Sequence, residues 1–386
     1  MRILAISSNV GDNAPGIVVE RFLCELQKTH VVDVLTYDYQ RSPDMPGLKN
    51  VYSKGFWIGN EKIRRRLTTK LIEALGYDPA DELRKRHVLK SLKGGYDVIL
   101  GFCYGFYMFG QTAGVVAKKR FRAPLVAYYF DAIPSPAGWV KDGLYRRNLG
   151  RLVSRGLAAA DGILSSNRKM LEYELGFLPE GHRNIPSGYV YTPCVSSTIC
   201  HLLHSEGVPF VFLFAGSVYG PRKIKYFIGA FAKLLIDHPD CEIWFVGTRN
   251  IEGELAALRP EIASKIKVTP RVKDLVPYYE ASGALVDIDA ELPDDVFLSS
   301  KITNYISVDR PIISETGQNS ESRRIFAGLE TVLQCGHDED DLYKAMKSVV
   351  ERTEDYDYSE RADLIKTFSL EANTSKLVHF LSSVSE

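Results

Sequence analysis

The sequence has no surplus of charge of either sign. Its 386 residues include 48 Lys and Arg and 48 Asp and Glu, so the formal net charge is zero. A protein that binds nucleic acid through the phosphates needs a basic surplus to replace the bound counterions. This balance therefore argues against nucleic acid as the main partner.

Closely spaced cysteines are also missing. No CxxC pair and no Cys/His cluster has the spacing of a zinc site. Most of the six cysteines lie in apolar segments, which is typical of buried free thiols in a reducing cytoplasm. They are Cys24, Cys103, Cys194, Cys200, Cys241 and Cys335. The eight histidines form no pattern either, and we expect His337 and His379 to be structural or solvated.

Long hydrophobic runs are rare in this chain. The N-terminal run MRILAISS is short and has no cleavage-type site, so we expect no signal peptide. One segment, Val98–Ala117, is uncharged and long enough to span a bilayer. Because it contains four glycines, Gln111 and Thr112, we favour a strand followed by a helix over a membrane span.

A chain of this length is too long for one hydrophobic core, so we expect two domains. Apolar strands alternate with helices in each half, which is typical of parallel sheets covered by helices. The sequence predicts an α/β fold with an N-terminal domain at 1–190, a linker rich in Ser and Pro at 191–208, and a C-terminal domain at 209–365. A final helix at 366–386 could pack back on the N-terminal domain.

The expected strands and helices follow the same alternation in both halves. Strands are expected at 2–7, 31–37, 97–102, 124–131, 161–166, 210–216, 242–247, 284–289 and 311–316. Helices are expected at 17–29, 112–121, 145–160, 224–237, 272–281, 300–308 and 368–383.

The first candidate site is the stretch GSVYGPRK, because ligands of parallel sheets bind beyond the carboxyl ends of strands. Gly216 and Ser217 allow a close approach of the backbone, and Pro221 is typical of a helix start. Arg222 would lie in the first helical turn, where a cation is unfavourable unless an anion is bound. An arginine fork suits a diphosphate, and a solvated surface arginine is the alternative.

A second pattern typical of anion binding is the stretch LSSKITNY. Ser299 and Ser300 precede Lys301 at an expected helix start, so the hydroxyl groups could touch a phosphate and the ammonium could neutralise it. One turn later, Asn304 and Tyr305 could face a sugar or ribose hydroxyl group.

Other candidates follow further expected strands. Gly16 could let the backbone approach a phosphate, and Gly247 lies in a similar loop. Asp131 could accept a proton from an acceptor or orient it, with a helix or turn cap as the alternative. Asp287 and Asp289 share one face of a strand by alternation, which leaves a metal-binding pair as an alternative.

The order of these motifs resembles a known family. GSVYGPRK, WFVG, ALVDID and LSSKITNYISVDRPII together resemble the donor-nucleotide domain of GT-B glycosyltransferases, in particular the retaining family with a glycogen-synthase-like C-terminal half. MRILAIS, the Gly16 loop and YYFDAIPSP resemble the acceptor domain more loosely. The resemblance implies two Rossmann-like, doubly wound domains with a cleft between them.

The resemblance also implies a reaction. It predicts a retaining hexosyltransferase that moves a sugar from a nucleotide-diphosphate sugar to a saccharide or lipid-linked acceptor, in bacterial polysaccharide or glycolipid assembly. Arg222, Lys301 and Asp131 would be catalytic, and no metal or other cofactor would be required. The implied donor-binding residues are Gly16, Gly216, Ser217, Arg222, Lys223, Gly247, Ser299, Ser300, Lys301, Asn304 and Tyr305.

The chain departs from the family pattern in three places, one of which is the glycine usual after the third strand, replaced here within Thr269–Arg271. The family's pair of Glu residues falls on Val296 and Asn304, and neither is a carboxylate. Ser217 stands where a basic residue normally follows the strand, so Lys223 or Lys225 would supply the second positive charge. The missing carboxylates leave a non-catalytic nucleotide-sugar-binding protein as an alternative, and a nucleotide-sugar 2-epimerase of similar architecture as another.

Basic residues gather in one part of the first half. Between Glu61 and Lys93 there are ten Lys and Arg against five Asp and Glu, and Lys118–Arg122 adds the run KKRFR. Such runs usually mark solvated helix faces. The sharper hypothesis is peripheral docking on anionic lipid at the inner face of the membrane, which would bring the first domain to a lipid-linked acceptor.

Overall fold

The computed structural model describes residues 1–11, 13–43, 45–53, 60–77, 89–105, 108–182, 184–194, 209–249, 251–292, 294–352 and 356–386. The chain divides into two compact units. The first consists of Met1–Pro193 with Leu370–Glu386, and the second of Cys194–Ser369. Residues 195–208 of the predicted linker, and with them Cys200, lie outside the described residues. The other five cysteines are buried free thiols.

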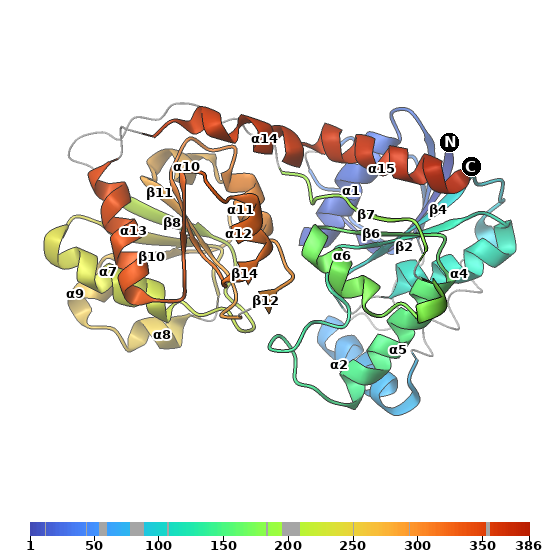
Figure 1. Cartoon of the computed structure of the whole chain (residues 1–386), viewed down its shortest axis with the longest axis horizontal. Coiled ribbons are helices and arrows are strands. Elements are labelled where there is room, and N and C mark those ends of the chain that lie inside the picture. The colour runs from blue at the N-terminus through green and yellow to red at the C-terminus, as the bar shows by residue number, and fades with distance from the viewer. Residues whose placement is uncertain are drawn as a thin grey trace. The chain divides into compact units, whose positions relative to one another are not determined.

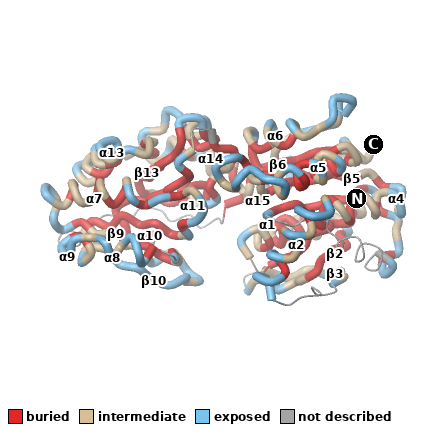
Figure 2. The backbone as a smooth tube through the Cα atoms, turned by 90° about the horizontal axis from the view of Figure 1, so that it is seen from below, coloured by how far each residue is buried: buried red, intermediate tan, exposed pale blue. Residues whose placement is uncertain are grey.

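The first unit is built on a parallel seven-stranded sheet in the order β3-β2-β1-β4-β5-β6-β7 (Figure 1). Its central strands are buried along their length, which explains why they read as uncharged runs (Figure 2). The strands are β1 (Arg2–Val10), β2 (Val31–Tyr39), β3 (Asn50–Ser53), β4 (Val98–Cys103), β5 (Leu125–Tyr129), β6 (Gly162–Ser165) and β7 (Ser187–Tyr189).

Helices cover both faces of this sheet. One apolar cluster joins the sheet to Phe109 of α4 and Val153 of α5, and another joins it to Phe22 of α1 and Leu377 of α15. The C-terminal helix thus packs in the first unit. The helices are α1 (Ala14–Leu26), α2 (Glu61–Leu75), α4 (Phe109–Phe121), α5 (Leu144–Ala159), α6 (Arg168–Leu175) and α15 (Leu370–Ser385), with short 3-10 turns at Leu89–Ser91 and Glu180–His182.

The apolar segment Val98–Ala117 contains strand β4 and the first part of helix α4, as we favoured from its sequence. No helix in the described part of the chain is both long enough and apolar enough to cross a bilayer.

The second unit has a parallel six-stranded sheet in the order β10-β9-β8-β11-β13-β15 and a separate pair, β12-β14. Its core joins Phe212 and Phe214 of β8 to Phe227 and Phe231 of α7 and to Met346 of α13. The strands are β8 (Val211–Ala215), β9 (Glu242–Val246), β10 (Ile266–Thr269), β11 (Ala284–Ile288), β12 (Asp294–Asp295), β13 (Ile312–Glu315), β14 (Asn319–Ser320) and β15 (Val332–Cys335).

The helices of the second unit vary widely in length. They are α7 (Lys225–Asp237), α8 (Glu252–Ala256), α9 (Pro260–Ala263), α10 (Val276–Ala281), α11 (Ser300–Tyr305), α12 (Glu321–Ile325), α13 (Glu339–Glu351) and α14 (Ala362–Phe368), with a 3-10 turn at Tyr358–Arg361.

Several helices begin at other residues than the sequence predicts, and two of these differences bear on candidate site residues. α7 begins at Lys225, so Arg222 precedes the helix and does not lie in its first turn. α1 begins at Ala14, because Asn13 caps it by accepting the Gly16 N–H at 2.9 Å. Gly16 therefore lies inside the helix and not in the loop before it.

The outermost strands of both sheets were missed. β3 and β7 are the edges of the first sheet, and β10 and β15 are the edges of the second. Each has only three or four residues and is partly exposed. They therefore lack the long uncharged run that identifies a central strand of a parallel sheet.

Candidate functional site

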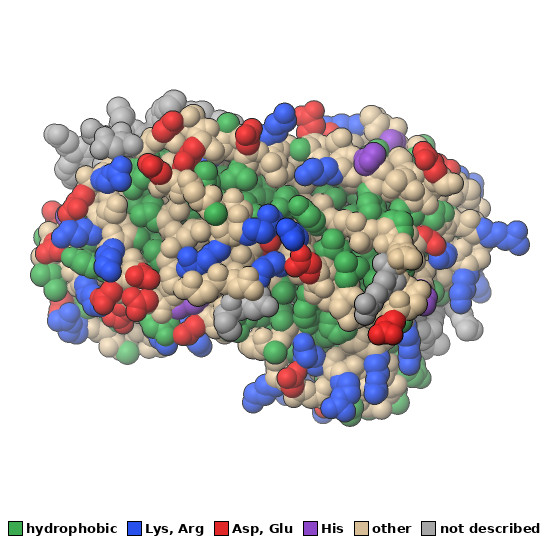
Figure 3. Space-filling model, viewed as in Figure 1, with side chains coloured by type: hydrophobic (Ala, Val, Ile, Leu, Met, Phe, Trp, Pro, Cys, Tyr) green, Lys and Arg blue, Asp and Glu red, His purple; other side chains and the backbone are tan. Residues whose placement is uncertain are grey.

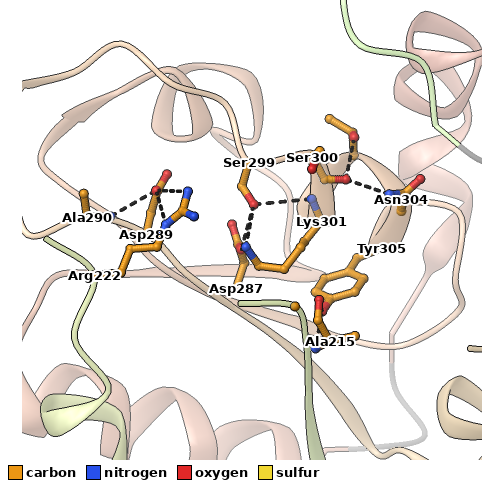
Figure 4. Close-up of polar contacts among 12 residues, drawn as sticks. Ala215, Arg222, Asp287, Asp289, Ala290, Ser299, Ser300, Lys301, Asn304 and Tyr305 are labelled. Atoms are coloured by element: carbon orange, nitrogen blue, oxygen red, sulfur yellow. Dashed lines mark hydrogen bonds and ion pairs between the residues drawn. The ribbon is translucent and has the colours of Figure 1, made fainter. Parts of the chain in front are cut away.

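The candidate site of the second unit lies at the carboxyl ends of β8, β11 and β13, which are neighbours in the sheet. β11 supplies two carboxylates here, Asp287 inside the strand and Asp289 directly after it. Alternation along the strand places both on one face, as the sequence predicts. Figure 4 shows that each carboxylate holds a cation, Lys301 on Asp287 and Arg222 on Asp289.

Lys301 forms a buried ion pair with Asp287. Its Nζ lies 3.1 Å from Asp287 Oδ1 and donates to Ser299 Oγ at 3.2 Å, while the Ser299 hydroxyl donates to Asp287 Oδ1 at 2.9 Å. Burial lowers the pKa of the Lys301 ammonium below its ordinary value, although Asp287 opposes this. The charge of Arg222 also lowers this pKa, so the two cations are close enough to repel each other.

Gly216 makes room for the Lys301 side chain. A Cβ atom on Gly216 would lie 2.6 Å from Lys301 Cδ, and the backbone there has a φ of +150°. The Gly216 carbonyl accepts the Thr248 hydroxyl at 2.6 Å. The glycine is thus required by the lysine that crosses it, a reason that the motif GSVYGPRK alone does not reveal.

Arg222 is held by Asp289 and by the turn that follows β11. Its Nη2 and Nε donate to Asp289 Oδ1 at 3.1 and 3.3 Å, and its guanidinium stacks on Tyr219, 4.8 Å from the ring centroid. Ala290 N–H donates to the same oxygen at 3.0 Å, and the backbones of Arg222 and Ala290 form an antiparallel bridge. Burial alone would lower the pKa of Arg222, but the attraction of Asp289 outweighs it and raises this pKa. Burial raises the pKa of Asp289, and Arg222 opposes this rise.

A Glu–His pair adjoins this contact, and no pattern in the sequence indicates it. His337 Nδ1 lies 2.8 Å from Glu315 Oε1, and His337 Nε2 lies 2.9 Å from the carbonyl oxygen of Ala290. Glu315 ends β13 and pairs in register with Ile288 of β11, while His337 follows β15. The sheet thus joins two residues that no local pattern connects.

Several predicted donor-site residues have other surroundings. Tyr305 is only 1% exposed, and its hydroxyl accepts the Ala215 N–H at 2.9 Å, so it lies in the core and does not face a ligand. The Asn304 amide donates to the Ser300 carbonyl at 2.7 Å. Ser217, Lys223 and Ser300 are exposed, whereas Ser299 is buried and caps α11. Gly247 has a φ of +73° in the loop after β9.

The remaining candidates, Gly16 and Asp131, belong to the first unit. The Gly16 N–H is already bonded to Asn13. Asp131 follows β5 and accepts the Gly105 N–H at 2.8 Å. Burial raises the pKa of the Asp131 carboxyl above its ordinary value, and the Gly105 N–H opposes the rise. A raised pKa suits a group that exchanges protons.

The structure gives the two family positions that lack a carboxylate, Val296 and Asn304, local surroundings of their own. Val296 is buried, and the Asn304 side chain is bonded to its own helix. Asp287 and Asp289, considered as a metal pair, each contact a cation instead. In the parts of the chain that the structure describes, no group of three or more His, Cys, Asp or Glu residues could hold a metal ion.

Comparisons with known proteins find the same fold in other proteins. Residues 209–352 match the family model of the glycosyl transferases group 1. No curated protein sequence matches the chain. Many solved structures resemble the chain. Among them are Anabaena Alr3699/HepE in complex with UDP and glucose (TM-score 0.68, 13% identity), the apo lipopolysaccharide outer core galactosyltransferase WaaB (0.65, 14%), and a sucrose-phosphate synthase from Thermosynechococcus elongatus (0.66, 14%).

Each of these alignments covers nearly the full length of both proteins. Each alignment includes 99% of this chain. The alignments cover 100% of HepE, 99% of WaaB and 98% of the synthase. The chain therefore has the GT-B fold, and most of its second unit matches the group 1 glycosyl transferase family model.

Proposed function

We propose that this protein is a retaining glycosyltransferase that moves a hexosyl group from a nucleotide-diphosphate sugar to a hydroxyl acceptor, in bacterial polysaccharide or glycolipid assembly. The group 1 match and the GT-B fold support sugar transfer. A UDP-sugar is the first donor to test, because a structure of similar fold contains UDP-glucose.

The observation that carries this proposal is the pair of cations at the carboxyl ends of the strands of the second sheet. Arg222 comes from the loop before α7 and Lys301 from the first turn of α11. The carboxylates of Asp289 and Asp287 at the end of β11 hold them in place. Their side chains are 7% and 14% exposed, while those of Asp289 and Asp287 are 1% exposed. The cations therefore lie nearer to solvent than the carboxylates, as an anion-binding site requires.

This arrangement suits a leaving diphosphate. Negative charge develops on the diphosphate as the bond to the sugar breaks, and cations already in position stabilise that charge without reorganisation. Arg222 and Lys301 would supply this stabilisation, so the proposed reaction needs no metal. Removal of one such group typically lowers the rate by about 10²–10³. Asp131 would accept or direct the acceptor proton.

A non-catalytic nucleotide-sugar-binding protein is the second candidate. Val296 and Asn304 occupy the positions where the family has carboxylates, and this observation favours the alternative. Turnover separates the two functions. The proposal predicts release of UDP from a UDP-sugar and, with an acceptor, a product whose anomeric configuration equals that of the donor by proton NMR. Binding without release of UDP would favour the second candidate, and a donor converted to its 2-epimer would indicate an epimerase.

Thermal unfolding with UDP, GDP, TDP, ADP and CMP tests donor binding. A ligand at about a hundred times its dissociation constant adds about 2.7 kcal/mol of stability, which shifts the melting temperature measurably. We expect one nucleotide diphosphate to stabilise the parent, and to stabilise Arg222→Lys less, because lysine lacks the fork that binds two oxygens at once. Failure of every nucleotide at millimolar concentration would contradict the proposal.

Arg310→Lys is the matched control for that experiment. Arg310 is as buried as Arg222, with 7% exposed, but it precedes β13 and so lies at the amino ends of the strands of the same sheet. It donates to the carbonyl oxygens of Ser282 and Glu280. Its replacement should lower the melting temperature without changing the shift that the nucleotide causes.

Peripheral membrane contact is a further part of the proposal. Helices α2 and α5 pack together, and Lys and Arg side chains gather over them in Figure 3. Large apolar side chains are also exposed on these two helices, Ile63 at 57%, Leu75 at 51% and Leu144 at 49%. A basic surface with exposed apolar residues is typical of docking on anionic lipid. The exposed basic residues are Lys62, Arg65, Arg66 and Lys70 of α2, and Arg147, Arg151 and Arg155 of α5.

Co-sedimentation with liposomes tests this contact. We expect the parent to bind vesicles of anionic lipid at low salt and to be released as salt is added. Replacing Arg147, Arg151 and Arg155 by Gln should weaken binding, because each basic residue near the surface contributes about 1 kcal/mol. The control variant replaces three Lys of the second unit in the same way, namely Lys233, Lys344 and Lys347. Equal loss of vesicle binding in both variants, or no vesicle binding by the parent, would contradict a specific contact.

A further inference from the structure

The Glu315–His337 pair is buried beside the contact that holds Arg222. Glu315 has no exposed side-chain surface, and His337 has 11% exposed. The ring of His337 is held at both nitrogens, by Glu315 Oε1 at 2.8 Å and by the carbonyl oxygen of Ala290 at 2.9 Å. This arrangement fixes the protons of the pair.

A carbonyl oxygen can only accept, so His337 Nε2 carries a proton that it donates to Ala290. His337 Nδ1 then faces a carboxylate oxygen at hydrogen-bond distance, and one proton must lie between them. The pair therefore holds one proton more than a neutral imidazole beside an ionised carboxylate. Loss of that proton would set the lone pair of Nδ1 against a negative oxygen, which is repulsive.

The residue whose carbonyl group His337 holds, Ala290, also positions Asp289 and Arg222. Ala290 donates its N–H to Asp289 Oδ1 at 3.0 Å, the oxygen that also accepts from Arg222. The Ala290 backbone bridges that of Arg222, and the Asp289 N–H donates to the backbone oxygen of Glu315 at 2.9 Å. His337 thus braces the turn after β11 from the side of β13 and β15.

Charged groups of other elements surround the pair. Burial raises the pKa of Glu315, and His337 opposes the rise. Burial alone would lower the pKa of His337, but the hydrogen bond and charge of Glu315 outweigh it and raise this pKa above 6.5. Other titratable groups act on the pair or belong to the elements packed around it. They are Asp287 of β11, Glu291 of the following turn, Lys225 and Tyr226 of α7, Arg323 of α12, Cys335 of β15, and Asp338 and Asp341 around the start of α13.

We propose that His337, with the proton it shares with Glu315, is a positioning residue that holds the 289–291 turn so that Asp289 presents Arg222 to the donor diphosphate. This inference rests on the proposed function of the site. The brace is complete below the raised pKa of the pair and is lost as pH rises through it, because a neutral imidazole has only one N–H to donate. Donor affinity should therefore fall as the pair loses its proton.

Calorimetric titration with UDP-glucose from about pH 6 to about pH 8.5 tests this inference, because the diphosphate diester keeps its charge over that range. The parent should bind about three- to tenfold more weakly at the upper end, the effect of one lost hydrogen bond. His337→Ala should bind weakly at every pH. Glu315→Gln should bind as the parent does at low pH and stay constant, because its amide donates to Nδ1 while a neutral His337 still donates to Ala290.

His238→Ala is the control, since His238 lies at the end of α7 next to Glu351 and should leave the pH profile unchanged. Proton NMR gives a second readout, with the His337 resonance identified by its loss in His337→Ala. A flat profile in a parent that binds, or a His337 resonance that titrates at or below pH 6.5, would overturn this inference alone. Absence of UDP-glucose binding at every pH would contradict the proposed UDP-sugar function, and the NMR titration would still decide the proton of the pair.

Discussion

Replacement of Lys301 by Met tests the ion pair at the centre of the site. Methionine keeps most of the apolar stem, which lies against Gly216, but removes the ammonium 3.1 Å from Asp287 Oδ1. Asp287 is 1% exposed, so the variant leaves a carboxylate buried without its cation. Removal of one partner of a buried pair costs about 3–5 kcal/mol. Because the Ser299 hydroxyl still donates to Asp287, we expect a loss near 3 kcal/mol.

The double variant Asp287→Asn with Lys301→Met separates stability from binding. It removes both charges, so the uncompensated carboxylate disappears and most of the lost stability should return, to within about 1 kcal/mol of the parent. The nucleotide site would still lack its ammonium. We therefore expect the double variant to unfold almost like the parent but to gain little stability from a nucleotide diphosphate.

Urea unfolding of the parent, both single variants and the double variant measures these values as a thermodynamic cycle. Melting with and without the nucleotide then reports binding for the same four proteins. If Lys301→Met costs less than about 1 kcal/mol, the pair is not buried as described. If the double variant regains nucleotide binding together with stability, Lys301 has a structural role alone.

Three further substitutions test other parts of the account. Gly216→Ala would place a methyl group 2.6 Å from Lys301 Cδ, so calorimetry should show nucleotide affinity reduced about tenfold or more while the circular dichroism spectrum is unchanged. Arg361 is fully buried and donates to the carbonyl oxygens of Val308, Arg310 and Thr331, so Arg361→Met should cost about 3 kcal/mol in urea unfolding without changing that affinity. Burial raises the pKa of Glu174 well above 4.5, so the native state binds this proton more tightly than the unfolded chain. Stability should thus fall as pH rises from 4.5 toward the raised pKa, and Glu174→Gln should remove that part of the pH dependence of melting.

Opposite results would contradict each of these expectations. Gly216→Ala with the affinity of the parent would mean that Lys301 does not need the space. Arg361→Met with reduced affinity at full folding would give that arginine a role in the site. Equal pH profiles for the parent and Glu174→Gln would mean that Glu174 is not buried in its neutral form.

The alternation of elements could be predicted from the sequence because it depends on local patterns. Central strands such as β4 and β8 are buried on both faces and read as uncharged runs, and the helices α4 and α7 follow them. The edge strands were missed because short, half-exposed strands carry no such signal. The first residues of helices were predicted less accurately. Pro221 suggested that α7 begins near it, but the helix begins at Lys225.

The candidate site could be predicted only in its parts. Arg222 and Lys301 were identified as cations after strands, but their partners depend on the register of the sheet, which joins residues far apart in sequence. For the same reason no pattern predicted Glu315 beside His337. The polar hydroxyl group of Tyr305 suggested that this residue faces a ligand. The hydroxyl instead accepts the backbone N–H of Ala215 inside the core.

The most direct test of the central claim compares UDP with UMP. Calorimetry measures both affinities for the parent and for the double variant Asp287→Asn with Lys301→Met. If the cation pair holds the diphosphate, the parent should bind UDP about tenfold or more tightly than UMP, and this ratio should fall toward one in the double variant. A ratio that is large in both proteins, or near one in the parent, would contradict the assignment of this site to the diphosphate.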